Sequence, residues 1–96
     1  MTHSVYFWLN DDADTAAFEA GLQALGAISA VKSIRVGKPA PTPERPVTDH
    51  SWSYNLVLEF DSVEDHNIYQ DHPDHHAFVD SCKQFWNRAM VLDTAF

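Results

Sequence analysis

Four stretches of the chain have the apolar pattern of β-strands. His3–Leu9 consists almost wholly of β-forming residues and is apolar on both faces, which predicts a strand covered on both sides. Trp52–Phe60 alternates large apolar side chains with mostly polar ones, a strong strand pattern. Val31–Val36, closed by Gly37, is a short strand, and Ala89–Phe96 ends the chain as another. The pattern therefore predicts a sheet of four strands.

Three further segments have helical spacing. After the first strand, apolar residues recur at steps of four, three and three, which is typical of the buried side of an amphipathic helix. These residues are Phe18, Leu22, Leu25 and Ile28. Ser62 begins a second helix, which runs to about Asp71, with a sequence like a capping box. The third helix starts at Pro73 and has an apolar side made of Phe78, Val79, Cys82, Phe85 and Trp86.

The boundary between the second and third helices lies at a proline within a run rich in histidine. Pro73 fixes its own φ and disfavours α geometry in the preceding residue, so His72 is expected to end one helix or cap the next. His75 and Phe78 then share one face of the third helix, and His76 points elsewhere. Tyr69, one turn before the break, is expected to aim its hydroxyl at the same place as His75.

The order of elements is β-α-β-β-α-α-β, which predicts an α+β fold of the ferredoxin-like type with a four-stranded antiparallel sheet. We expect one domain over residues 1–96 because chains of this length do not normally divide. Residues 38–51 contain four prolines and predict a long irregular loop, either a lid or partner-binding arm or, as we favour, an ordinary solvated excursion. Helices cover one face of such a sheet. Tyr6 and Trp8 would leave the other face apolar, so we expect a homodimer through the sheet faces.

Charge and composition exclude several classes of partner. The net charge is −8 with only six Lys and Arg, which argues against nucleic acid and anionic membranes as partners. No apolar run approaches the length of a membrane span, and no leader-like segment opens the chain. A single cysteine, Cys82, gives no intrachain disulfide. These features predict a cytoplasmic protein.

Tyr69 and His75 are the main candidates for chemistry. A neutral imidazole can take a proton from an activated carbon acid, and a tyrosine hydroxyl can donate to the oxygen where enolate charge develops. The alternative is that both side chains only hold the helix junction together. His3 is a candidate polar group of the same cavity, with a purely structural role as its alternative.

A metal site at the histidine-rich run is not expected. Asp71, His72, Asp74, His75 and His76 are close in sequence. However, His75 and His76 diverge by about 100° around a helix, and no second cluster supplies further ligands. We therefore expect no metal and no cofactor.

The whole chain resembles the stress-responsive A/B barrel (Dabb) family, whose members are dimeric α/β barrels. The resemblance rests on His3 in the first strand, the run Tyr69-Gln-Asp-His72-Pro73-Asp-His75, Phe85-Trp86, and Val91-Leu-Asp93 in the last strand. It implies that the sheets of two chains pack together to form a barrel. It also implies a cavity between sheet and helices, lined here by Phe7, Tyr54, Phe78 and Trp86.

The resemblance implies several functions. Some members of the family are polyketide cyclases that close a ring by an aldol reaction without a cofactor, and Tyr69 and His75 match their catalytic residues. His3 matches a histidine that lines their cavity, whereas Tyr54 stands where a further histidine can occur. Our first hypothesis is therefore a cavity for a small apolar carbonyl compound, with aldol chemistry. The alternatives are a non-catalytic stress-associated dimer and, by analogy of fold alone, a cofactor-free monooxygenase. The sequence leaves open whether the protein is an enzyme.

Overall fold

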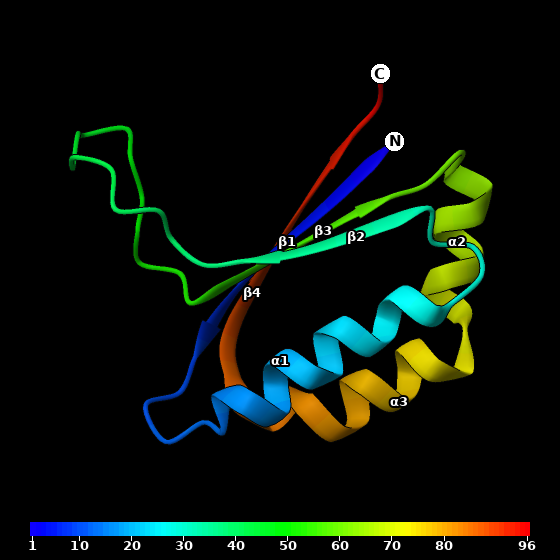
Figure 1. Cartoon of the computed structure of the whole chain (residues 1–96), viewed down its shortest axis with the longest axis horizontal. Coiled ribbons are helices and arrows are strands. Elements are labelled where there is room, and N and C mark those ends of the chain that lie inside the picture. Colours follow the sequence, from blue (N-terminus) through cyan, green and yellow to red (C-terminus); the bar gives the residue numbers. More distant parts are fainter.

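The computed structural model describes residues 1–96 and shows a four-stranded antiparallel sheet with helices on one face (Figure 1). The strands are β1 (Thr2–Leu9), β2 (Ser33–Gly37), β3 (Tyr54–Glu59) and β4 (Trp86–Thr94), in the spatial order β2-β3-β1-β4. The helices are α1 (Thr15–Ala24), α2 (Val63–Asp71) and α3 (Pro73–Cys82), with 3₁₀ turns at Leu25–Ala27 and Lys83–Phe85. This architecture confirms the predicted ferredoxin-like α+β fold.

Strand β1 lies in the interior of the sheet, and its side chains alternate between the two faces. It pairs with β3 on one side and with β4 on the other, so that His3 lies opposite Leu58 and Asp93. His3, Val5 and Phe7 are buried on the face that the helices cover. The alternate residues of β1 lie on the open face, where Tyr6 and Trp8 are half-buried.

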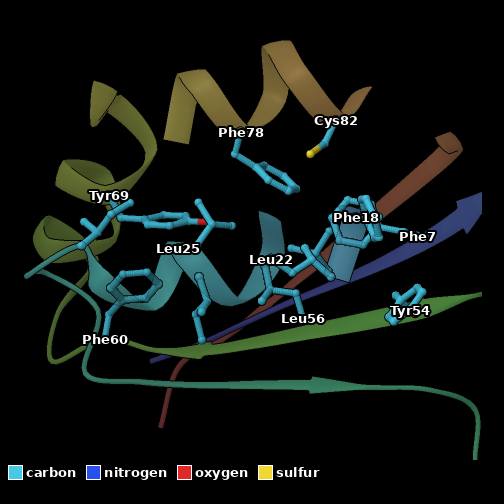
Figure 2. Close-up of a cluster of buried hydrophobic side chains, with 13 residues drawn as sticks. Phe7, Phe18, Leu22, Leu25, Tyr54, Leu56, Phe60, Tyr69, Phe78 and Cys82 are labelled. Atoms are coloured by element: carbon cyan, nitrogen blue, oxygen red, sulfur yellow. The ribbon is translucent and has the colours of Figure 1, made fainter. Parts of the chain in front are cut away.

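The hydrophobic core fills the layer between the sheet and the helices (Figure 2). The predicted apolar stripe of α1 forms its centre, with Phe18 and Leu22 fully buried. Helix α1 ends at Ala24, however, and a 3₁₀ turn carries the chain onward to Ile28, which is extended but still buried. A Cβ on Gly26 would lie 2.7 Å from Ile34 Cγ2, so glycine permits the close approach of this turn to β2.

The last strand starts earlier than predicted. We expected a strand over residues 89–96 with Trp86 still on the third helix, but β4 begins at Trp86 and ends at Thr94. After α3 the chain makes a 3₁₀ turn, and Asn10 N donates to Phe85 O at 2.8 Å, which brings Trp86 into the sheet opposite Leu9. Apolar spacing alone could not separate the end of the helix from the start of the strand.

Two of the other three strands begin later than predicted. Val31 N donates to Ile28 O at 3.0 Å in a turn, so β2 begins only at Ser33. Trp52 precedes β3, and its indole N–H donates to Asp49 O at 2.9 Å within the preceding loop. Both errors lie at strand ends, where turns take over the backbone hydrogen bonds.

The segment between β2 and β3 extends away from the body as a long arm (Figure 1). It contains no helix or strand. Its end is attached to the body by three hydrogen bonds. They run from Trp8 Nε1 to Ser51 Oγ at 2.9 Å, from Ser53 N to Phe7 O at 2.7 Å, and from Leu9 N to Ser53 Oγ at 2.9 Å. These bonds fix the entry of the chain into β3.

Strand β4 is an exposed edge of the sheet. It pairs only with β1, and Met90, Val91 and Leu92 are 36%, 50% and 51% exposed. Met90 and Leu92 lie opposite Tyr6 and Ser4 on the open face, whereas Val91 lies opposite Val5 on the helix side. The helix layer therefore leaves β4 largely uncovered. No helix in the structure has the length and apolar character needed to cross a membrane.

The break at Pro73 takes the predicted form. His72 has extended geometry, with φ −67° and ψ 139°, as expected for a residue before proline. It ends α2, where its N–H donates to Tyr69 O, and it caps α3, where its Nδ1 accepts from Asp74 N at 3.0 Å. One residue thus satisfies backbone groups of both helix ends.

This double role of His72 predicts a specific stability pattern. Replacing His72 with Ala removes the capping acceptor and should lower the free energy of unfolding by about 0.5–2 kcal/mol. His72→Asn restores an acceptor suited to the N-cap position and should recover most of that loss. Urea denaturation of the two variants and the wild type measures the difference, and equal losses in both variants would contradict the capping role.

Candidate functional site

A cavity of about 160 Å³ lies between the sheet and helices α2 and α3. Its lining is mainly apolar, with polar groups from His3, Tyr69, Gln70 and His75. The full lining is His3, Val5, Phe7, Leu56, Tyr69, Gln70, His75, Phe78, Val79, Trp86, Ala89 and Val91. All the site residues predicted from the sequence line this cavity except Tyr54. Because exposed Val91 is part of the wall, the cavity lies on the side of the uncovered strand β4.

Tyr54 lies at the other end of the core (Figure 2). Its ring packs against Phe18 with centroids 5.5 Å apart, and its hydroxyl donates to Glu19 Oε2 at 3.1 Å. Burial and the nearby Glu19 carboxylate raise the pKa of Tyr54. The structure thus gives Tyr54 a place in the packing between β3 and α1, away from the cavity.

Tyr69 is almost fully buried, with 1% of its surface exposed. Its ring meets the His75 ring edge to face with centroids 4.8 Å apart, and the His3 ring at 6.0 Å. Figure 2 shows its hydroxyl turned toward the interior of the layer between helices and sheet. Burial raises the pKa of Tyr69 well above its usual value, so the phenol keeps its proton and remains a hydrogen-bond donor at neutral pH.

His75 lies in the first turn of α3, on the other side of the Pro73 break. Its Nδ1 is the one fully buried side-chain nitrogen or oxygen without a hydrogen-bond partner. Burial, assisted by the neighbouring His76, lowers the pKa of His75. The imidazole is therefore neutral at neutral pH and able to accept a proton. A buried polar atom without a partner costs stability, which makes Nδ1 the natural contact for a ligand group.

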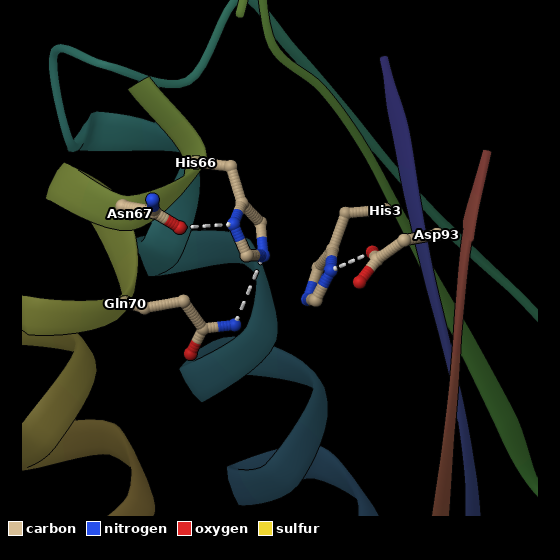
Figure 3. Close-up of polar contacts among 5 residues, drawn as sticks. All are labelled: His3, His66, Asn67, Gln70 and Asp93. Carbon is tan, nitrogen blue, oxygen red and sulfur yellow. Dashed lines mark hydrogen bonds and ion pairs between the residues drawn. The ribbon is translucent and has the colours of Figure 1, made fainter. Parts of the chain in front are cut away.

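His3 is held in place by the last strand (Figure 3). The ring is 2% exposed, and Nδ1 lies 2.6 Å from Asp93 Oδ1. Burial lowers the pKa of His3, although the Asp93 carboxylate acts in the opposite direction. Since a carboxylate can only accept, Nδ1 carries the proton in the neutral ring and Nε2 has a free lone pair.

The sequence analysis did not place His66 or Asp93 in the predicted site. The His66 ring lies 4.8 Å from the His3 ring, and its Nδ1 donates to Asn67 Oδ1 at 3.0 Å. Two signals pointed to them. His66 stands three residues before Tyr69, and so on the same helix face, and Asp93 is the one acidic residue of the last strand.

A second, larger hollow of about 300 Å³ lies between α1 and α3. Its walls include Gly21, Ala24 and Ala77, and its polar side chains are Asp74 and Ser81. It contains no histidine or tyrosine, so it lacks the pair of an imidazole and a phenol that the smaller cavity has. The smaller cavity therefore remains the candidate site.

The lowered pKa of His75 predicts how stability depends on pH. As the pH falls below about 6.5, His75 is protonated in the unfolded chain before it is protonated in the folded chain. The unfolded state then binds more protons, so acidification should destabilise the protein. His75→Gln removes this contribution. The fall in melting temperature from about pH 7.5 to about pH 5, measured by circular dichroism, should be smaller in the variant than in the wild type. An equal fall in both proteins would contradict this assignment.

Comparison with known proteins gives matches along the whole chain. Residues 1–96 match the sequence model of the Stress Responsive A/B Barrel Domain. No curated protein matches the chain significantly in sequence.

Several solved structures have the same fold. A dimeric ferredoxin-like protein of unknown function from Thermobifida fusca has a TM-score of 0.79 at 21% identity, covering 99% of this chain and 89% of its own. The protein At3g17210 from Arabidopsis thaliana has a TM-score of 0.80 at 17% identity, with coverages of 98% and 92%. A Dabb-family protein with a ferredoxin-like fold from Mesorhizobium loti has a TM-score of 0.73 at 25% identity, with coverages of 98% and 93%.

Proposed function

Because the chain belongs to the stress-responsive A/B barrel domain family, we propose that it binds a small, largely apolar carbonyl compound beside Tyr69 and His75. The observation that carries this proposal is that His75, whose buried Nδ1 lacks a hydrogen-bond partner, lines an otherwise mainly apolar cavity. A ligand with one polar end and an apolar body matches such a lining.

The volume of the cavity limits the ligand to about one ring. The cavity measures about 160 Å³. An apolar cavity of about 150 Å³ accepts benzene, whereas sites for drug-sized ligands begin at about 300 Å³. The proposed ligand is therefore a compound such as a cyclic or aryl ketone rather than an extended polyketide chain.

Tyr69 and His75 support proton transfer to and from this ligand. The neutral His75 imidazole takes a proton from the carbon next to the carbonyl, while the Tyr69 hydroxyl donates a hydrogen bond to the oxygen that gains enolate charge. In an aldol step the enolate carbon then attacks a second carbonyl carbon. The resulting alkoxide recovers the proton from His75, so the protein ends the cycle unchanged. At neutral pH the buried Tyr69 phenol keeps its proton and the His75 imidazole with its lowered pKa is neutral, which are the protonation states that these two roles need.

Exchange of the α-hydrogens of acetophenone for deuterium in D₂O, followed by proton NMR, tests this function directly. The wild type should accelerate the exchange, and His75→Ala should lose about 100-fold or more of that acceleration. Tyr69→Phe should also exchange slowly while still binding the ketone. His76→Ala is the matched control, since His76 is adjacent but exposed, and it should keep wild-type activity.

The same experiment separates catalysis from architecture. If neither variant changes ketone binding or exchange, and both only lower the melting temperature, then Tyr69 and His75 merely hold the helix junction. A wild-type protein that neither binds acetophenone nor exchanges its α-hydrogens would contradict the proposed ketone binding and the proposed chemistry.

We also propose that two copies of the chain pack through the open faces of their sheets. This face carries Tyr6, Trp8, Met90 and Leu92, and no helix covers it. The Thermobifida fusca protein of the same fold is described as dimeric. Burying this apolar face against a second sheet adds hydrophobic core to a domain that is small on its own.

A pair of charge insertions tests the dimer. Leu92 on the open face and Ile68 on α2 are similarly exposed, at 51% and 52%. Leu92→Glu should place a charge in the interface and yield monomers, whereas Ile68→Glu should leave the dimer intact. Light scattering after size-exclusion chromatography measures the mass. A monomeric wild type, or an equal effect of both substitutions, would contradict the proposed interface.

A further inference from the structure

Two imidazole rings face each other where β1 lies next to α2 (Figure 3). The ring centroids of His3 and His66 are 4.8 Å apart, and the nearest ligand-type atoms of His3, His66 and Asp93 all lie within 4.8 Å of one another. No other group of three or more histidine, cysteine or acidic side chains comes together in this way. The histidine-rich run around Pro73 therefore does not form a cluster of ligands, whereas two histidines distant in sequence do.

The hydrogen bonds of the two rings leave Nε2 of His3 free and Nε2 of His66 with a single long contact. His3 Nδ1 donates to Asp93 Oδ1 at 2.6 Å, and His66 Nδ1 donates to Asn67 Oδ1 at 3.0 Å. In both neutral rings the lone pair is consequently on Nε2. His3 Nε2 has no hydrogen-bond partner, and His66 Nε2 has only a long contact of 3.4 Å from Gln70 Nε2. Figure 3 shows both Nε2 atoms turned into the gap between the rings.

A species that accepts electron density from both lone pairs, such as a metal ion, suits a gap that two imidazole nitrogens face. We propose that this gap binds a divalent first-row transition-metal ion such as Zn²⁺, with Nε2 of His3 and Nε2 of His66 as ligands. Imidazole nitrogen suits Zn²⁺ and its neighbours, whereas Mg²⁺ and Ca²⁺ prefer oxygen. Asp93 completes a carboxylate–histidine–metal arrangement, because it accepts from the opposite nitrogen of His3 and fixes the orientation of the ring.

The surroundings allow an ion to enter and to complete its coordination. The Asp93 side chain is 45% exposed and His66 is half-buried, so the gap is close to solvent. A Zn–N bond measures about 2.0–2.1 Å, so the two rings must move toward a shared ion when it binds. Gln70 adjoins the gap through its amide nitrogen and also lines the cavity, and water is suited to the remaining coordination positions. The net charge of −8 favours cations in general.

Calorimetric titration of Zn²⁺ into the full chain, first freed of metal with a chelator, tests this site. The wild type should bind one ion per chain, and His66→Ala should lose this binding. Asp93→Asn should bind about 10- to 100-fold more weakly because it loses the carboxylate charge that makes His3 a more basic ligand. His76→Ala, which removes an exposed histidine elsewhere, should bind as the wild type does. Zn²⁺ should also raise the melting temperature of the wild type but not that of His66→Ala.

The opposite results overturn the proposal. These are a wild type that binds no Zn²⁺ at neutral pH, a His66→Ala variant with unchanged affinity, or loss of binding in His76→Ala. The inference is independent of the proposed ketone chemistry. Tyr69→Phe should retain full Zn²⁺ affinity whether or not it loses proton exchange, so the two proposals fail separately.

Discussion

Pro73 has no backbone N–H and excludes α geometry from His72, so one continuous helix cannot follow β3. The chain instead changes direction, and α3 returns beside α1 across the sheet (Figure 1). This break places Tyr69, at the end of α2, and His75, at the start of α3, on two walls of one cavity. In a straight helix the two rings, six positions apart in the sequence, would lie more than one turn apart. The proline constraint is thus the reason that the two polar rings converge on an apolar space.

The sequence was sufficient for the fold and for much of the cavity because both depend on regular patterns. Alternation in β1 and spacing in α1 each follow from burying one face of an element, and Phe18 and Leu22 are fully buried as expected. Pro73 acts through local sterics that need no tertiary information. Only element ends were misplaced, as at Trp86, where a 3₁₀ turn continues the helical spacing after the helix has stopped.

The remainder of the site could not be predicted, because it depends on strand register. His3 meets Asp93 only because β1 and β4 are antiparallel neighbours in one particular register. A shift of one residue would place the two side chains on opposite faces. His66 joins them through the placement of α2 over the end of the sheet. Tyr54 is the converse case, because its strand was correctly assigned but its ring packs beneath α1 rather than at the cavity.

The uncovered edge strand β4 also has a consequence for the solubility of the protein. Ala89–Leu92 is an uncharged apolar run whose outer backbone edge has no partner. Such an edge can template the addition of foreign strands, and natural proteins usually protect it with lysine, proline or a covering element. Here only Arg88 and Asp93, which flank the run, provide charges. Conditions that separate or loosen the sheets should therefore favour ordered aggregation that starts from β4, well before the core around Phe18 unfolds.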